Sequence, residues 1–285
     1  PLVVALTTGA LSLFTTTALA FQQTMTCNTG GGPFACQPGE MPKPVHWSER
    51  CVLFYVHEEG SLDVPGTLTD GHPLLDSVRD SFDTWNDVTR SDLLMQYAGL
   101  TNEDRAEFIE ARGEEGNANI ITWRDAEWPY ASKTAFAITS VTFDPTNGLI
   151  ADADIEFNSE HHLFTVGDRG VLVDARNTLT HEAGHFLGLD HSAIPEATMF
   201  GSAPEGELQK RTLHADDIQG LVSIYPSTGA NVDCGRFPDY FEAPRDDDSD
   251  EGCCKGSSSV ASSRPAPLLA LGLVVLVGFR RRRRR

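Results

Sequence analysis

Basic residues are scarce in this sequence. It has 22 lysines and arginines against 41 aspartates and glutamates among its 285 residues, a formal net charge of -19, and six of the 22 are the terminal arginines 280–285. Such an acidic chain repels polyanions, which argues against nucleic acid as a partner. The carboxylates fit calcium-rich surroundings, where they serve as oxygen ligands, and fit equally well a role in solubility alone.

Near the C-terminus, the apolar run is too short to cross a membrane unless the small residues on either side extend it. Pro267–Phe279 spans about 20 Å as a helix, whereas the hydrocarbon core of a bilayer is about 30 Å thick. The arginines behind it should stay cytoplasmic and place the preceding chain across the membrane. Cys253 and Cys254 are adjacent, which favours processing or lipid attachment over a mutual bond. We expect residues 265–285 to be a temporary tether or a stable anchor.

Charge is absent from residues 1–20. This stretch is rich in Leu, Ala, Val and Thr and ends in Ala18-Leu19-Ala20, the small-x-small pattern of a secretory cleavage site. We therefore predict a signal peptide over residues 1–20 and a mature chain that begins near Phe21. The alternative interpretation is an apolar helix.

Cysteine is infrequent, and the six present fit an oxidising compartment. Four of them lie before the acidic run at residues 246–251, at Cys27, Cys36, Cys51 and Cys234. They can pair in three ways, and the sequence does not choose among these. A Cys51–Cys234 bond would join the start of the central domain to its end, and a Cys27–Cys36 bond would close a glycine-rich loop.

The most informative stretch runs from His181 to His191, with the sequence His-Glu-Ala-Gly-His-Phe-Leu-Gly-Leu-Asp-His. On a helix, His181 and His185 share a face, because residues four apart are about one turn apart. Gly188 can end this helix in a left-handed conformation, so that the chain reverses and His191 approaches the other two imidazoles. Three neutral imidazoles with a fourth position open to water are the ligand set of a catalytic zinc.

Glu182, beside the first histidine, is the group that such a zinc site needs for hydrolysis. The metal would lower the pKa of its water, and the Glu182 carboxylate is placed to take the proton. A His-Glu-x-x-His match alone is weak, but the longer pattern is specific, which disfavours three unrelated histidines. We predict His181, His185 and His191 as metal ligands and Glu182 as the catalytic residue.

The residues around this motif carry a family resemblance. Met199 follows His191 by eight residues, and an extended histidine motif with such a methionine turn resembles the metzincin pattern. Within that group, Ser192 directly after the third histidine resembles the matrixins, the subgroup that includes the matrix metalloproteinases. Asp216–Tyr225 and Phe82–Trp85 are similar to the last helix and the first long helix of matrixin catalytic domains.

The resemblance covers roughly residues 45–226 and implies an α+β fold, a twisted mixed sheet with a long active-site helix and a C-terminal helix. It implies Met199 beneath the metal and an edge strand that pairs with extended substrate. It does not extend to a structural zinc, because Asp154 stands about where the matrixins have one of the histidines for it. Cys36 lacks the surroundings of the matrixin latency cysteine, so we expect no switch of that kind.

Structural calcium is a further implication of the resemblance. Matrixins bind it near a turn like that at residues 144–148, and the oxygen ligands available here are of the right type. Turn chemistry alone explains the same residues equally well. The candidate ligands are Asp144, Asn147, Asp152, Asp154 and Glu156.

Periodicity predicts the elements of this fold. Helices are expected at about residues 74–89, over the histidine motif, and at about 215–224, while residues 101–118 form a polar surface insertion. Pro followed by Asn-Gly within residues 144–148 predicts a hairpin between the strands on either side. The predicted strands are Cys51–Val56, Leu93–Tyr97, Asn119–Trp123, Ala135–Phe143 and Ala151–Phe157.

These observations give one domain with processing segments at both ends. After the signal peptide we expect an N-terminal segment at 21–44, a catalytic domain at 45–228 and an acidic, Ser-rich linker at 229–264. The segment 265–285 resembles the C-terminal sorting tails of myxobacterial surface proteins, in which cysteine, apolar stretch and arginine cluster follow in that order.

The predicted function is that of an exported, monomeric zinc endopeptidase, extracellular or at the cell surface, that acts on protein or peptide. A non-catalytic binding or adhesion module that keeps the zinc site is the alternative from another class. Glu182 argues against it, because a module that only holds zinc has no use for a base. Another metzincin branch with the same ligands is the second enzymatic alternative.

Overall fold

The computed structural model describes residues 20–27, 29, 35–112, 117–229, 232–235 and 240–241. The predicted sorting tail, and the predicted signal peptide except for its last residue, lie outside these residues. Within the described part of the chain, no helix has both the length and the apolarity needed to cross a bilayer.

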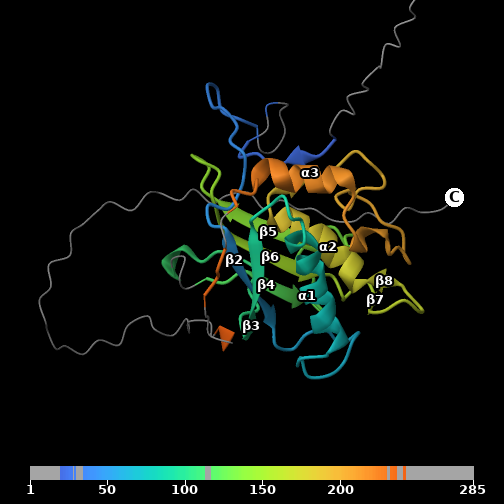
Figure 1. Ribbon diagram of the computed structural model, residues 1–285. Coiled ribbons are helices and arrows are strands. Elements are labelled where there is room, and N and C mark those ends of the chain that lie inside the picture. The colour runs from blue at the N-terminus through green and yellow to red at the C-terminus, as the bar shows by residue number, and fades with distance from the viewer. Residues whose placement is uncertain are drawn as a thin grey trace, which may run out of the picture.

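A six-stranded mixed sheet forms the centre of the molecule (Figure 1). All neighbouring strands are parallel except the last pair, β6 and β5, which are antiparallel. The strands, in their spatial order, are β10 (Tyr240–Phe241), β3 (Leu94–Thr101), β2 (Cys51–His57), β4 (Ile120–Trp123), β6 (Ile150–Phe157) and β5 (Ala137–Phe143). The predicted α+β class with a mixed sheet is confirmed, as are the five predicted strands.

The predicted hairpin is also present, and it leaves β5 at the edge of the sheet. At the turn, the amide of Gly148 donates to the Asp144 carbonyl at 2.7 Å. Gly148 has a φ of 83°, and a Cβ there would lie 2.1 Å from the carbonyl oxygen of Pro44, so only glycine fits. One side of β5 therefore remains without a neighbouring strand among the described residues.

Two helices cover one face of the sheet (Figure 1): α1 (Pro73–Asn86) and α2 (Ala175–Phe186). The apolar stripe of α1 includes Phe82, whose ring stacks on Phe54 of β2 and meets the edge of Phe186 of α2. Trp85 ties the two helices together, because its indole N–H donates to the Thr180 carbonyl at 2.8 Å. Each of these buried aromatic side chains contributes roughly 1.5–3 kcal/mol of stabilisation.

The third helix, α3 (Ala215–Ile224), has the bounds predicted from the sequence. It packs against the chain that follows α2, where β9 (Leu189–Asp190) pairs with the N-terminal strand β1 (Gln22–Gln23). The amide of Ala20 donates to a carboxylate oxygen of Asp216 on α3 at 2.9 Å. The start of the described chain is thus part of the packed body.

Two disulfides close the fold, and they are the two pairs singled out above, Cys27–Cys36 and Cys51–Cys234. The second joins the start of β2 to the segment after α3. In the part of the chain that the structure describes, the remaining short elements are β7 (Phe164–Thr165), which pairs with β8 (Val173–Asp174), and two 3-10 turns. These turns are η1 (Glu110–Arg112), in the predicted surface insertion, and η3 (Gln209–Arg211).

Candidate metal centre

The helix that carries the first two histidines is fixed at both ends. At its start, a carboxylate oxygen of Asp174 accepts from the Asn177 amide at 2.7 Å, which satisfies an amide that the helix leaves unpaired. At its end, Gly188 adopts the predicted left-handed conformation, with a φ of 89°. A Cβ at Gly188 would lie 2.3 Å from the carbonyl oxygen of Val45, so the backbone passes too close for any other residue.

This reversal brings the three predicted ligands together. The Nε2 atoms of His181 and His185 are 3.2 Å apart, and one ring nitrogen from each of the three histidines lies within 4.8 Å of the others. The ring centroid of His191 is 5.3 Å from that of His181 and 5.0 Å from that of His185. No other group of three or more His, Cys, Asp or Glu residues in the described ranges has this geometry.

Backbone carbonyls decide which ring nitrogens carry protons. The Nδ1 of His181 lies 2.6 Å from the Thr198 carbonyl oxygen, and the Nδ1 of His185 lies 2.7 Å from that of Leu189. A carbonyl only accepts, so each Nδ1 carries the hydrogen and each neutral ring has its lone pair on Nε2. The Nε2 of His191 is buried without a hydrogen-bond partner.

Burial keeps these rings neutral. It is the main cause that lowers the pKa of His181 and of His185 well below the usual value, and the charge of His191 acts in the same direction on both. Burial also lowers the pKa of His191, although the nearby Asp190 carboxylate raises it. Three neutral imidazoles with converging lone pairs fit a zinc ion in both donor type and number.

Glu182 is fully buried, and its two carboxylate oxygens have different surroundings. Oε2 accepts a hydrogen bond from the hydroxyl of Thr139 on β5 at 2.6 Å. Oε1 is buried without a hydrogen-bond partner. Burial raises the pKa of Glu182 to about 8, and the Thr139 hydroxyl opposes that rise. A carboxyl whose pKa lies near neutrality can both take and give a proton there.

The loop that carries Met199 contacts His181 through the Thr198 carbonyl and is held from two sides. Its amides at Thr198 and Met199 donate to the carboxylate of Asp217 on α3, at 2.8 and 2.9 Å. Its carbonyls at Ala197, Thr198 and Phe200 accept from the buried ammonium of Lys210. The Thr198 carbonyl is the one that also orients His181, so Lys210 and the first histidine share an acceptor.

Met199 itself packs directly under the helix. A Cβ at Gly184 would lie 2.1 Å from the Met199 sulfur, so the glycine in the histidine motif makes room for the methionine. Met199 therefore packs against the helix that carries the first two histidines, and its position beneath the metal stays a prediction.

Sequence reasoning missed Thr139 and Lys210. A signal for Thr139 exists, because it is the polar member of an otherwise apolar, inward-facing row on β5 with Ala137 and Val141. Lys210 gives no comparable signal. It lies in a short 3-10 turn, and its partners are backbone carbonyls that only the tertiary fold brings close.

The candidate calcium ligands do not form such a cluster. Asp144 accepts from the amide and hydroxyl of Thr146, and Asn147 accepts from the Leu149 amide, both as expected of a turn. Asp152, Asp154 and Glu156 lie buried on β6. Calcium at this turn stays a prediction.

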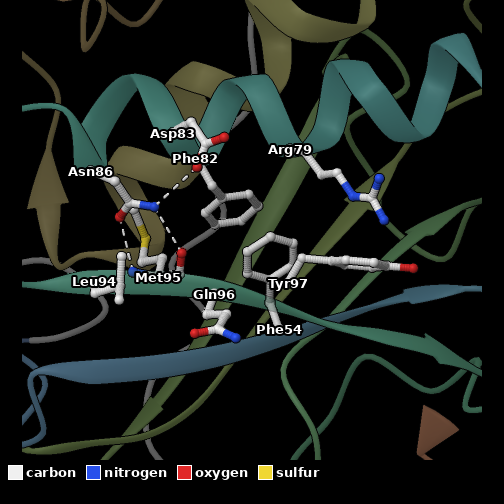
Figure 2. Close-up of a pocket in the computed structure, with 9 residues that line it drawn as sticks. All are labelled: Phe54, Arg79, Phe82, Asp83, Asn86, Leu94, Met95, Gln96 and Tyr97. Atoms are coloured by element: carbon white, nitrogen blue, oxygen red, sulfur yellow. Dashed lines mark hydrogen bonds between the residues drawn. The ribbon is translucent and has the colours of Figure 1, made fainter. Parts of the chain in front are cut away.

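A separate pocket lies between α1 and β3, lined in part by Phe54 and Tyr97 (Figure 2). The amide group of Asn86 binds both backbone groups of Met95 across it, donating to the carbonyl at 2.8 Å and accepting from the amide at 2.9 Å. The guanidinium of Arg79 lies over the ring of Tyr97. The lining residues include neither a histidine of the cluster nor Glu182, so this pocket is not part of the metal centre.

Comparison with known proteins finds metalloproteinases among the relatives of this chain. Matrix metalloproteinase-19 of Homo sapiens is 30% identical over 188 residues, which cover 63% of this chain and 30% of that protein. Metalloendoproteinase 2-MMP of Arabidopsis thaliana is 26% identical over 165 residues, or 56% of this chain and 39% of that protein. Matrilysin of Homo sapiens is 35% identical over 83 residues, 29% of this chain and 30% of that protein.

The aligned region thus spans about a third of the length of these relatives. A family model described as matrixin matches residues 69–226, more than half of the chain. That range contains α1, the sheet strands from β3 to β6, the three histidines, Met199 and α3. With this match, the histidine motif and the fold all in agreement, the chain belongs to the matrixin family.

Proposed function

We propose that this chain is a zinc-dependent endopeptidase that hydrolyses peptide bonds in proteins or peptides. The observation that carries the proposal is a convergence of three ring nitrogens beside a buried carboxylate. Three imidazoles present ring nitrogens to one point, and one carboxylate oxygen of the adjacent Glu182 is buried without a partner. A folded protein rarely leaves buried polar atoms unpaired unless a ligand or a reaction uses them.

His181, His185 and His191 would hold the zinc through Nε2. Bound there, zinc supplies Lewis-acid chemistry, polarising a carbonyl and making a water molecule acidic. The two Nδ1 hydrogen bonds to Thr198 and Leu189 keep the first two rings in the tautomer whose lone pair lies on Nε2.

Glu182 would move the protons. As a carboxylate, it takes a proton from the attacking water at Oε1, the oxygen without a partner. As a carboxylic acid, it then gives that proton to the nitrogen of the leaving amine, which restores the carboxylate. Its surroundings suit both steps, because burial raises the pKa of this carboxyl group above its usual range.

The edge strand β5 would hold the substrate. Its free edge offers backbone groups to an extended peptide, and such pairing tolerates many side chains. Thr139, the partner of Glu182, belongs to the same strand. Substrate binding and proton transfer would therefore involve one structural element.

Digestion of casein by the purified full chain tests this function. We expect fragments when zinc is present, none after a chelator, and recovery on adding zinc back. A non-catalytic binding module would bind zinc and release no fragments, so this outcome would favour the alternative. Mass mapping of the fragments would show internal cleavage, as expected of an endopeptidase.

We also propose export through the N-terminal signal peptide and transient or stable tethering through the C-terminal segment. The two disulfides and the matrixin family fit an extracellular location. Sequencing the N-terminus of the secreted protein tests the signal peptide, for which we expect Phe21 as the first residue. Intact mass then distinguishes a cleaved tail from a retained anchor.

A further inference from the structure

The inward face of β5 carries one hydroxyl in an apolar setting. Ala137, Thr139 and Val141 alternate toward α2, and all three are buried. An apolar side chain would serve packing at the middle position as it does at the outer two. A buried hydroxyl costs free energy unless it is hydrogen-bonded, so the partner of Thr139 indicates why it is there.

That partner is Glu182. The Thr139 Oγ1 lies 2.6 Å from Glu182 Oε2 and 3.3 Å from the backbone carbonyl oxygen of Glu182. Both groups are buried. A hydrogen bond to a charged acceptor is stronger in the protein interior than at the surface. The short distance to Oε2 assigns the hydroxyl hydrogen to that oxygen.

The two carboxylate oxygens of Glu182 are therefore not equivalent. Oε2 already accepts a hydrogen from Thr139, whereas Oε1 has no partner. A proton from water would go to Oε1. Rotation of the carboxyl group, which would exchange the two oxygens, breaks the bond to Thr139.

We propose that Thr139 is a positioning residue for Glu182: its hydroxyl holds Oε2 so that Oε1 is the oxygen that exchanges protons in catalysis. This inference rests on the proposed peptidase function. Thr139 does not touch the predicted metal ligands through any of its hydrogen bonds, so its removal should act on turnover and leave zinc binding intact.

The test compares Thr139→Val, which removes the hydroxyl at nearly constant shape, with Thr139→Ser, which keeps it. For Thr139→Val we expect kcat on a fluorogenic peptide to fall about 10- to 100-fold, as for loss of a hydrogen bond to a charged group. KM and the zinc dissociation constant should stay within about twofold. Thr139→Ser should recover kcat to within about threefold of the wild type. Thr142→Val, on the opposite face of the same strand, is the matched control.

A double-mutant cycle with Glu182→Gln separates positioning from packing. If Thr139 acts through Glu182, adding Thr139→Val to the Glu182→Gln variant should reduce the residual rate no further. Should Thr139→Val fail to fold, Thr139→Ala replaces it in both comparisons. Wild-type kcat in the folded variant, or full additivity in the cycle, overturns the inference. A wild-type protein that cleaves no peptide overturns the proposed function itself, which is a distinct result.

Discussion

The metal centre and strand β6 both bury several ionisable side chains, but they differ in what those side chains bind. At the metal centre, His191 Nε2 and Glu182 Oε1 are buried with no partner. On β6, each carboxylate has one. Asp154 accepts from the Ile120 amide at 2.9 Å, and Glu156 accepts from Arg124 at 2.6 Å and from the Tyr130 hydroxyl.

This difference separates the proposed metal site from a network of structural hydrogen bonds. The carboxylates of Asp154 and Glu156 on β6 are hydrogen-bonded within the protein, so we expect this network to stabilise the sheet. In the histidine cluster, one nitrogen of each ring converges on one point, and His191 Nε2 is buried without a hydrogen-bond partner.

Removing one imidazole should give the largest effect, because two histidines alone should not hold the zinc. We expect His185→Ala to lose bound zinc and to lower peptidase activity at least about 1,000-fold. Elemental analysis after gel filtration and a fluorogenic peptide assay measure the two. His161→Ala, outside the cluster, should keep both. A variant at His185 that retained stoichiometric zinc would show that the ligand set is different.

Glu182→Gln should lower peptidase activity without loss of bound zinc, whereas His185→Ala should remove both. The amide cannot take a proton, so we expect activity to fall about 100- to 10,000-fold while bound zinc stays at the wild-type level. Zinc content and kcat measured on the same preparation check this. Glu196→Gln, at an exposed glutamate in the loop before Met199, is the control, and activity in Glu182→Gln close to that of this control would contradict the assigned role.

Lys210→Met should have a smaller effect, on metal affinity. The ammonium donates hydrogen bonds to three carbonyls of the Met199 loop, including the Thr198 carbonyl that orients His181. Without it, we expect zinc to bind about 10-fold more weakly, the lower end of the effect of residues that orient metal ligands. Competition with a chromophoric chelator measures the affinity. Lys43→Met, at an exposed lysine, controls for charge, and equal zinc affinity in both variants would exclude this role for Lys210.

On β6, the expected effect is on stability and its dependence on pH. Burial raises the pKa of Asp152 to about 7 and that of Asp154 well above its usual value, and Asp152 also raises the latter. The folded state thus holds a proton that the unfolded state releases near pH 4, so the free energy of unfolding should fall as pH rises from about 4 to about 7.

Asp154→Asn tests that dependence, because the amide replaces the shared proton with a permanent donor. As pH rises from 4 to 7, the free energy of unfolding of the wild type should fall while that of the variant stays nearly constant. The difference between the two should therefore grow by about 2–4 kcal/mol in favour of the variant. Urea unfolding at several pH values measures it, with exposed Asp87→Asn as the control. Parallel pH profiles for Asp154→Asn and the wild type would refute the shared-proton account.

The difference between local and long-range contacts explains how far the sequence could predict the structure. The histidine motif is local, so helix periodicity and one glycine sufficed to place His181, His185 and His191 together. Two-residue strands such as β1 and β10 have no periodicity to detect, and they exist only because distant segments meet them. Thr139 was readable as a polar residue in an apolar row, whereas the contacts of Lys210 with backbone carbonyls depend wholly on the tertiary fold.

The most direct test of the central claim is an anomalous difference map at the zinc absorption edge from crystals of the zinc-loaded protein. We predict a peak bounded by the Nε2 atoms of His181, His185 and His191, close to Glu182 Oε1. A map without density there, or with zinc held by other residues, would contradict the proposed metal centre and the hydrolytic function with it.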